Sequence, residues 1–226
     1  MDRTEQLRRH TFLLGASDVA LEHIDQNCRW FNAKRGQILL SHTEPSTDIY
    51  LLVSGSLEVE IFTEAGRSIF FRDVFPGELV GEIAAIDGKP RSASVVARTD
   101  CCVAIISAEV LWETLRRDEL LNRRLLQMLA DKVREMTDQV YFLTAYDVPT
   151  RIVAELLRMS ARDEAGTAGR SIKPFPTHEA FATRVGTTRE AVTRTLGQLS
   201  AEGFIVKDRS GITLLKYDEM QGLLPR

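Results

Sequence analysis

Short apolar runs separated by glycine-containing turns occupy most of the chain between Arg29 and Ile106. Residues 57–61 alternate strictly between apolar and acidic side chains, which indicates a strand with one buried and one solvated face. The pattern predicts strands over residues 37–40, 49–53, 57–62, 68–73 and 94–97, a buried strand over 101–106, and turns at Ser54 and Gly55 and at Ala65 and Gly66. Several short strands with regular turns are typical of a small sandwich or barrel.

Two other stretches have helical periodicity. Residues 1–27 form a polar, amphipathic helical segment whose apolar side comprises Leu7, Phe12, Leu13, Leu14, Val19, Leu21 and Ile24. Residues 108–145 are expected to form one long helix of roughly 55 Å at 1.5 Å per residue. Within it, an unbroken heptad pattern comprises Leu126, Leu129, Val133, Met136, Val140 and Leu143.

The heptad seam allows two interpretations. It could pack on the β domain of its own chain, or it could pair with a second copy. The seam is narrow and has charged flanks, which favours a parallel homodimer; the flanking residues are Asp131, Lys132, Arg134, Glu135 and Asp138.

The long helix is expected to end at Asp147, Val148 and Pro149, because proline biases the residue before it away from the helical conformation. A hinge or domain boundary is therefore expected there. Thr150 is then expected to cap a helix over residues 151–162, and residues 163–173 to form a polar loop.

The C-terminal part predicts a helix-turn-helix with a wing. Thr177 opens a short helix with Phe181 and Ala182 on its inner side, and Gly186 supplies the turn. Thr187 and Glu190 fit a capping box for a second helix, and its buried stripe comprises Val192, Leu196 and Leu199. Residues 204–206 and 212–214 predict a β-hairpin around the turn at 208–211.

Three charged residues near the start of the second helix could contact DNA bases. Arg189, Glu190 and Arg194 are expected on its exposed N-terminal half, where a recognition helix meets the base edges. Arginine suits guanine O6 and N7, and glutamate can accept from cytosine N4. A solvated, purely structural charged face is the alternative interpretation.

The distribution of charge and the cysteine content narrow the possible classes of protein. Residues 1–147 carry 17 Lys+Arg and 23 Asp+Glu, a net charge of −6, whereas residues 148–226 carry 12 and 9, a net charge of +3. A mildly basic module behind an acidic one suits nucleic-acid binding with a separate sensor. Three unclustered cysteines argue against a disulfide framework. No apolar run approaches the ~18 residues of a membrane span, and we expect a cytoplasmic protein.

Residues 81–93 carry the most specific signal. Glu82 supplies a carboxylate for a ribose hydroxyl, and Arg91 a planar guanidinium for an anionic phosphate. Ser92 and Ala93 can add a hydroxyl and backbone N–H groups, and Gly81 lets the backbone approach a ligand. In residue types and spacing this stretch resembles the phosphate-binding cassette of cyclic-nucleotide-binding domains. A tight surface loop with an incidental ion pair is the alternative.

The chain as a whole resembles the cyclic-AMP receptor protein (Crp-Fnr) family of bacterial transcription regulators. The resemblance implies an α+β fold, with a β-roll domain over residues 1–107, a dimerisation helix and hinge over 108–147, and a winged helix-turn-helix over 148–226. It implies that the protein is a homodimer and not an enzyme, with double-stranded DNA and RNA polymerase as partners and cyclic AMP or cyclic GMP as ligand. The implied ligand residues are Gly81, Glu82, Ile83, Arg91, Ser92, Ala93 and Thr137, and the implied DNA residues are Thr188, Arg189, Glu190 and Arg194.

The resemblance also implies half-sites of the TGT or TGTGA type, because Arg189, Glu190 and Arg194 match the Arg-Glu-x-x-x-Arg pattern of the cyclic-AMP branch. Two departures stand in the long helix. Met136 and Thr137 replace the family's Thr-Ser pair, which contacts adenine, and Asp131 and Lys132 replace a pair of arginines. These departures bear on the choice of nucleotide and on its coupling to DNA binding.

Other functions on this sequence make different demands. An iron–sulfur sensor needs an N-terminal cysteine cluster, and Cys28 stands alone there. Haem could use His10, His23 or His42. A phosphodiesterase could use Glu78, Glu82 and Asp87, but such hydrolysis normally needs a metal held by His and Asp, and no histidine lies between His42 and His178. We therefore expect neither a metal site nor a catalytic residue, and keep as the nearest alternative a regulator of the same fold that is ligand-independent or senses another effector.

Overall fold

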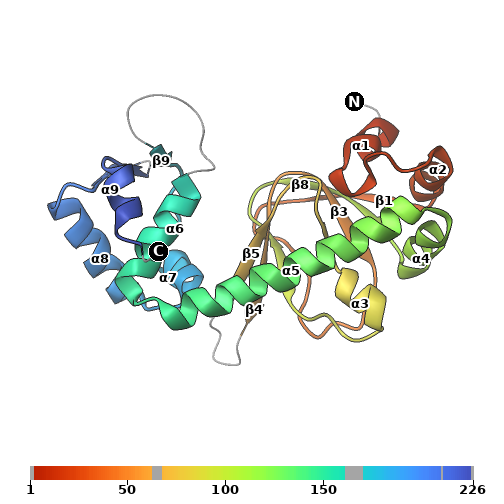
Figure 1. The fold of residues 1–226 in the computed structure, drawn as a ribbon. Helices are drawn as coiled ribbons and strands as arrows, with labels where there is room; N and C mark the ends of the chain where they lie inside the picture. Colours follow the sequence, from red (N-terminus) through yellow and green to blue (C-terminus); the bar gives the residue numbers. More distant parts are fainter. Residues whose placement is uncertain (1–2, 63–67, 161–169, 210, 225–226) are drawn as a thin grey trace. The chain divides into compact units, whose positions relative to one another are not determined.

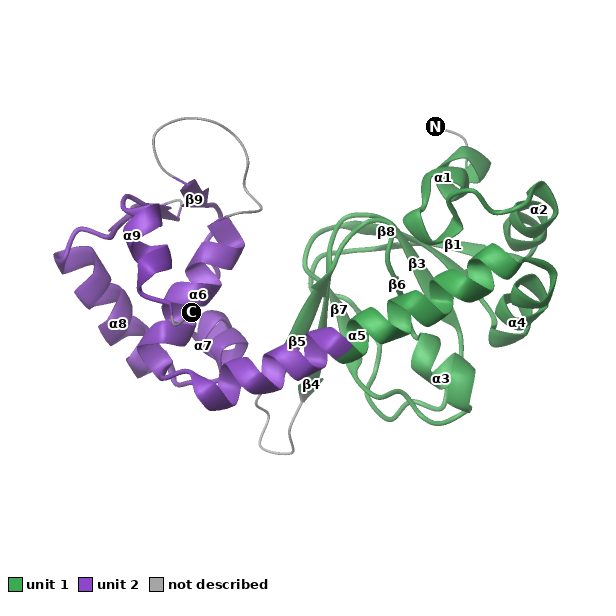
Figure 2. Ribbon diagram, in the orientation of Figure 1, with its two compact units in different colours: residues 1–133 green, residues 134–226 purple. Residues whose placement is uncertain are grey.

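The computed structural model describes residues 3–62, 68–160, 170–209 and 211–224 (Figure 1). The chain divides into two compact units, residues 1–133 and 134–226 (Figure 2). Helix α5, Glu119–Ala145, begins in the first unit and ends in the second. The turn expected at Ala65 and Gly66 lies outside the described residues.

The described strands of the first unit form two antiparallel four-stranded sheets, in the orders β1-β8-β3-β6 and β2-β7-β4-β5. The six predicted strands are confirmed to within one residue at each end, whereas β1 and β6 were not predicted. The bounds are β1 Arg29–Ala33, β2 Ile38–Leu40, β3 Ile49–Ser54, β4 Leu57–Phe62, β5 Ser68–Val74, β6 Leu79–Val80, β7 Ser94–Ala97 and β8 Cys101–Ile106.

One hydrophobic core is built from inward-facing residues of both sheets. Leu52, Leu57, Val74 and Val103 are fully buried in it. Burying each such side chain contributes about 1.5–3 kcal/mol relative to exposure. Val80, which directly precedes the cassette, is part of this core.

The N-terminal segment is helical but broken, so the expected continuous helical stretch over residues 1–27 is only partly confirmed. It comprises α1 Arg3–Arg9, a short 3-10 helix η1 Thr11–Leu13 and α2 Asp18–Asn27. Gly15 takes a left-handed conformation with φ +77° between them, and Ser17 caps α2 by accepting from the backbone of Ala20. Leu14 and Val19, expected on the apolar side, are 57% and 62% exposed.

The prediction of a single helix over residues 108–145 is wrong. Helix α4, Ala108–Arg117, ends before Asp118, and α5 begins after it. One carboxylate oxygen of Asp118 accepts from the backbone N–H of Leu121 at 3.1 Å, and the other accepts from that of Ser17 at 2.8 Å. Helix α5 has 27 residues, which corresponds to about 40 Å. None of the helices in the described ranges combines the length and apolar character of a membrane span.

The second unit begins with α6, Val148–Ser160, whose start differs from the prediction. The Asp147 carboxylate, not Thr150, caps it, accepting from the backbone N–H of Thr150 at 2.9 Å. Residues 161–169 lie outside the description, but strand β9 overturns the expected loop at residues 170–172. The unit continues with β9 Arg170–Ile172, α7 His178–Val185, α8 Arg189–Ala201, β10 Ile205–Lys207, β11 Ile212–Leu214 and α9 Tyr217–Gly222.

Helices α7 and α8 and the β10–β11 hairpin confirm the winged helix-turn-helix. Its core buries Phe181, Val192 and Leu196 completely. The hairpin continues into a three-stranded sheet of order β10-β11-β9. The cap of α8 is Thr188, whose hydroxyl accepts from the backbone of Ala191 at 3.3 Å, so the capping box predicted from Thr187 is wrong by one residue.

Candidate nucleotide and DNA sites

The cassette begins where strand β6 turns into the short helix α3, Glu82–Asp87. Gly81 stands at this turn with φ +93°, a conformation that favours glycine. A Cβ atom on Gly81 would lie 2.6 Å from the carbonyl oxygen of Asp48 and 2.7 Å from Nη1 of Arg91. Glycine is therefore needed here both for its backbone angle and for the space that Arg91 fills.

Arg91 is buried beside Gly81, with 3% of its surface exposed. Its Nη1 donates to the carbonyl of Gly81 at 3.0 Å, its Nη2 to the carbonyl of Asp48 at 2.7 Å, and its Nε to the hydroxyl of Ser46 at 3.0 Å. Burial lowers the pKa of Arg91, and Tyr50 and nearby carboxylates oppose this. Nη1 and Nη2 of Arg91 each keep one further N–H group that could donate a hydrogen bond to a phosphate.

Glu82 is equally buried, and it pairs with a residue that the sequence pattern did not single out. Nζ of Lys132, on α5, donates to Oε1 of Glu82 at 2.7 Å. The Lys132 side chain is 14% exposed. Burial lowers its pKa, and the charge of Glu82 acts in the opposite direction. In the sequence, Lys132 is a charged flank of the heptad seam and one of the two residues that replace a pair of arginines, and no local signal points to its contact with Glu82.

The remaining cassette residues lie closer to the surface. Ser92 is exposed, Ala93 is half-buried, and Ile83 is 39% exposed. The structure thus brings the buried Glu82 and Arg91 together with the half-buried Gly81 in one cluster, and Ser92, next to Arg91, is exposed. Thr137 is exposed and belongs to the second unit, so its contact with a nucleotide stays a prediction.

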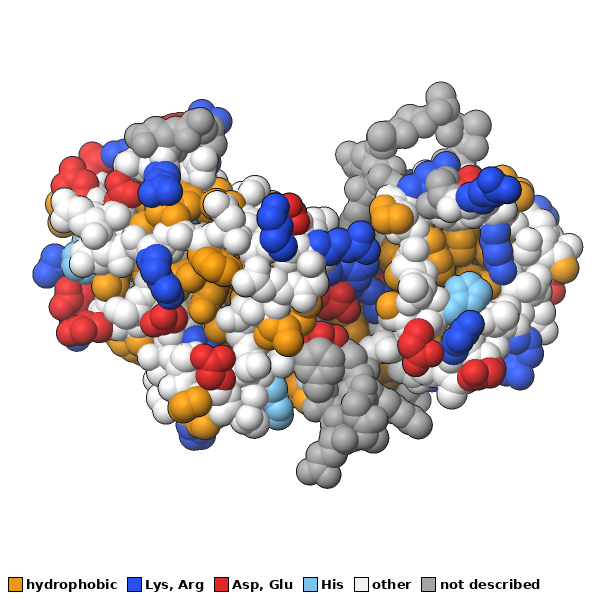
Figure 3. Space-filling model, turned by 180° about the vertical axis from the view of Figure 1, so that it is seen from behind, with side chains coloured by type: hydrophobic (Ala, Val, Ile, Leu, Met, Phe, Trp, Pro, Cys, Tyr) orange, Lys and Arg blue, Asp and Glu red, His pale blue; other side chains and the backbone are white. Residues whose placement is uncertain are grey.

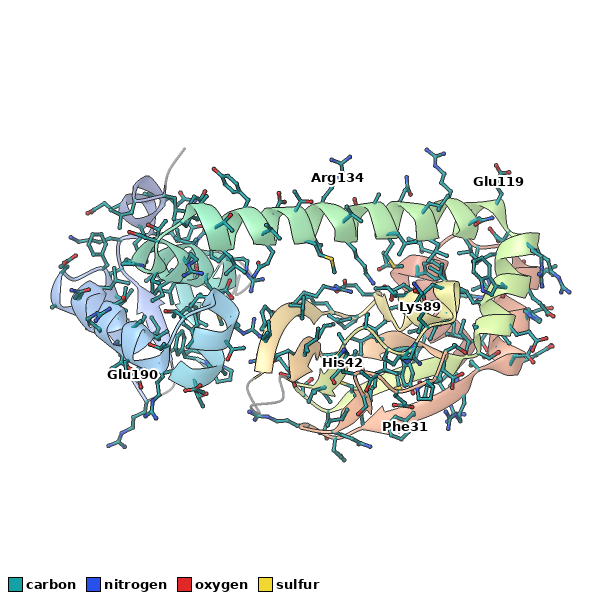
Figure 4. The ribbon with its side chains drawn as sticks, turned by 90° about the horizontal axis from the view of Figure 1, so that it is seen from below. Phe31, His42, Lys89, Glu119, Arg134 and Glu190 are labelled. Atoms are coloured by element: carbon teal, nitrogen blue, oxygen red, sulfur yellow. The ribbon has the colours of Figure 1, made fainter. Side chains whose placement is uncertain are left out.

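The helix-turn-helix presents its charged residues to solvent. Gly186 forms the turn with φ +61°, and its N–H donates back to the end of α7. Arg189, Glu190 and Arg194 are all exposed on α8, and Glu190 lies on the surface of its unit (Figure 4). Hydrogen bonds from its own backbone N–H and from Thr188 lower the pKa of Glu190. Its carboxylate is therefore charged and oriented at neutral pH.

The carboxylates considered for hydrolysis have other partners. Arg72 donates to Glu78 at 2.6 Å, and the Asp87 carboxylate accepts from the backbone of Lys89 at 3.1 Å. Within the described ranges, no group of three or more His, Cys, Asp or Glu side chains could hold a metal ion.

The histidines considered for haem occupy separate environments. His10 is buried near the carbonyl of Glu78, and burial lowers its pKa to about 4. His23 faces Glu113 at 3.1 Å, and His42 is exposed.

Both units match known domain families. Residues 30–118 match the model of the cyclic nucleotide-binding domain. Residues 150–223 match the model of the Crp-like helix-turn-helix domain. The first match contains the buried cluster of Glu82 and Arg91, and the second contains α7, α8 and the hairpin.

Curated relatives align over most of the chain. A CRP-like cAMP-activated global transcriptional regulator from Mycobacterium tuberculosis is 25% identical over 203 residues, covering 89% of this chain and 90% of the relative. The cAMP-activated global transcriptional regulator CRP from Salmonella typhimurium is 27% identical over 202 residues, covering 89% of this chain and 95% of the relative. Both relatives are described as transcriptional regulators.

Solved structures share the fold. The regulator CLP of Xanthomonas campestris superimposes with a TM-score of 0.77 at 23% identity, covering 88% of this chain and 99% of that one. FixK2 of Bradyrhizobium japonicum superimposes with a TM-score of 0.74 at 21% identity, and the match covers 88% of this chain and 98% of FixK2. From the two domain models in this order and the relatives that span both, we conclude that the chain belongs to the cyclic-AMP receptor protein (Crp-Fnr) family of bacterial transcription regulators.

Proposed function

We propose that this regulator binds a cyclic nucleotide and, as a homodimer, recognises palindromic DNA with TGT-type half-sites. The cluster of Gly81, Glu82 and Arg91 carries this proposal, because it combines a ribose acceptor and a phosphate donor in one small volume. The exposed Arg189 and Arg194 on α8 support the DNA half of it. RNA polymerase is the further partner proposed for this function.

The ligand residues are already engaged within the chain, which shapes how a nucleotide would bind. Arg91 keeps N–H groups for the phosphate while its bonds to Gly81 and Asp48 hold it in place. Glu82 accepts from Lys132 through Oε1, and its carboxylate has lone pairs left for the ribose 2′-hydroxyl. Cyclic AMP is the first choice, since the relatives from Mycobacterium tuberculosis and Salmonella typhimurium are described as cAMP-activated. Cyclic GMP is a close second.

Calorimetry of the purified chain against cyclic AMP and cyclic GMP tests the ligand. Arg91→Leu should weaken binding by at least ~2 kcal/mol, because it removes charge-assisted hydrogen bonds. Arg117→Leu, at an exposed position on α4, is the matched control. Ser92→Ala should give a smaller loss without affecting the fold, since Ser92 is exposed. Unchanged affinity in Arg91→Leu would overturn the site.

A third titration arm uses cyclic di-GMP, since the regulator CLP with the same fold is described as c-di-GMP responsive. If none of the three nucleotides binds, the result supports the alternative that the regulator is ligand-independent. The operator titrations below then decide whether DNA recognition stands without a ligand.

Dimerisation through α5 is supported by its exposed apolar stripe. Leu126, Val133 and Val140 are 65%, 64% and 62% exposed in the single chain. Leu121 and Leu125 on the same helix are buried in the core of their own unit, and Leu129 packs partly against it. The chain therefore packs one side of α5, with part of Leu129, against its own unit, and Leu126 and Val140 of the heptad side are exposed to a partner.

Light scattering tests the dimer. Leu126→Glu should give a monomer, because it would bury like charges without partners at the seam, at a cost of several kcal/mol. Gln127→Glu, one exposed position off the seam, should remain dimeric. A dimeric Leu126→Glu protein would show that the stripe is not the interface.

The end of α5 offers a route from the dimer to the DNA-reading helices. A Cβ atom on Gly186 would lie 2.8 Å from Cδ2 of Leu143, so the end of α5 touches the helix-turn-helix turn. A nucleotide that shifts α5 would shift this contact. We expect nucleotide to strengthen operator binding by ~1–3 kcal/mol, and operator DNA to strengthen nucleotide binding equally. Equal operator affinity with and without nucleotide would contradict the coupling.

A further inference from the structure

His178 occupies a defined position between the two helices of the DNA-reading motif. It is the first residue of α7, and its Nδ1 lies 2.8 Å from the hydroxyl oxygen of Thr193 on α8. That hydroxyl donates its proton to the backbone carbonyl of Arg189 at 2.9 Å. Because a hydroxyl has one proton, Thr193 accepts from His178, and Nδ1 carries a hydrogen. Nε2 is therefore the nitrogen that gains or loses a proton.

The ring is also held from its other side. Phe175 meets it edge-on, with ring centroids 6.5 Å apart and planes at 87°. Phe175 in turn packs on the fully buried Phe181, with centroids 5.0 Å apart. The orientation of His178 is thus set by the core of the unit as well as by Thr193.

Two cations from other elements act on the charge of His178. Burial lowers the pKa of the His178 ring, and the cations of Lys207 on β10 and Arg189 on α8 lower it further. Glu179, the next residue of α7, is exposed. Figure 3 shows this face of the second unit, where Lys, Arg, Asp and Glu side chains reach the surface around a histidine. In the free protein the ring is therefore neutral at pH 7, beside two cations.

An anion placed against the His178 ring would raise its pKa, since the negative charge would offset both cations and stabilise the imidazolium. DNA supplies such an anion at this position. In a helix-turn-helix the second helix enters the major groove while the first crosses the phosphate backbone. His178 belongs to the first helix and is hydrogen-bonded to the second, next to Arg189.

We propose that His178 contacts a DNA phosphate as an imidazolium, so that each protomer takes up one proton from solvent when it binds DNA. The proposal rests on the proposed DNA-binding function and adds a contact outside the base-reading set. A phosphate contact carries no sequence preference by itself, so the same proton uptake accompanies binding to unrelated duplexes. Lys207 adds a second cation at that phosphate, and the charge of the base-reading Arg189 lies nearby.

The test is a titration of a fluorescent palindromic duplex with TGT-type half-sites between pH 5.5 and 8.0, at constant ionic strength and with excess cyclic AMP. For the wild-type protein, affinity should rise as pH falls, by up to about tenfold per protomer for each pH unit. His178→Gln should abolish this dependence and bind at pH 6 as weakly as the wild type does at pH 8. His178→Lys, a permanent cation, should bind tightly with a flat profile.

His42→Gln is the matched control, because His42 is exposed in the first unit and should leave the pH profile unchanged. Calorimetry of DNA binding in buffers of different ionisation enthalpy should count about one proton per protomer. A flat wild-type profile, or a His178→Gln profile as steep as that of the wild type, overturns the proposal. Absence of duplex binding at every pH overturns the proposed function and this proposal with it.

Discussion

The cassette and the DNA-reading helix α8 both carry charged residues proposed to bind a ligand or DNA, but those of the cassette are buried and those of α8 are exposed. Glu82 and Arg91 are each 3% exposed, and both bond within the chain. Arg189 and Arg194 on α8 are exposed. Buried charges must be paired for the unit to fold, whereas exposed ones contribute little to stability and stay available to a partner. The same substitution should therefore act on folding in one region and on binding in the other.

The largest effect is expected from Lys132→Met, which would leave the Glu82 carboxylate buried without its cation. Breaking such a pair costs ~3–5 kcal/mol of folding free energy. Urea unfolding followed by tryptophan fluorescence measures it, since both tryptophans, Trp30 and Trp112, lie in the first unit. Adding Glu82→Gln should recover much of the loss. If Lys132→Met alone were as stable as the wild type, the Lys132–Glu82 pair would not be required for folding.

A smaller effect distinguishes two glycines at the ends of α3. Gly81 and Gly88 have φ +93° and +69°, but only a Cβ on Gly81 would meet backbone and Arg91, while one on Gly88 meets nothing within 4 Å. Gly88→Ala should cost about 1 kcal/mol, the conformational term alone. Gly81→Ala should cost at least ~1 kcal/mol more, because overpacking adds to that term, and should weaken nucleotide binding. Equal losses in the two variants would mean that the site tolerates the added methyl group.

The smallest effect on folding is expected from Arg189→Ala. Stability should change by no more than ~0.5 kcal/mol, as at other exposed positions. Operator binding should weaken by ~1–3 kcal/mol and lose preference at one guanine per half-site. Competition with operator variants at fixed salt measures both. If Arg189→Ala weakened binding equally for all operator variants and reduced the salt dependence of binding, Arg189 would contact a phosphate instead of a base.

Local patterns were sufficient for much of the fold. Strand β4 could be predicted to the residue, because its alternating side chains and the turn residues before it lie within a few positions of each other. The helix-turn-helix was also visible, since Thr177, Gly186 and the buried stripe of α8 form a short-range signal. The spacing of Gly81, Glu82 and Arg91 likewise lies within one segment.

Other features depended on residues far apart in the chain. The break between α4 and α5 follows from Asp118, whose carboxylate accepts from the backbone of Ser17, 101 residues away. Strand β9 exists because it pairs with β11, and its three residues carry too little pattern to predict a strand. The local pattern predicted a continuous helix at the first place and a loop at the second, and long-range hydrogen bonds decided otherwise.

The sequence by itself determined the family, the order of the two domains and the residue types of the cassette. Only the tertiary structure decided what holds that cassette: Ser46 and Asp48 around Arg91, and Lys132 against Glu82. These partners come from segments 43 to 50 residues away. A buried charge takes whichever partner the packing of distant elements brings within hydrogen-bond reach, and no local spacing records that choice.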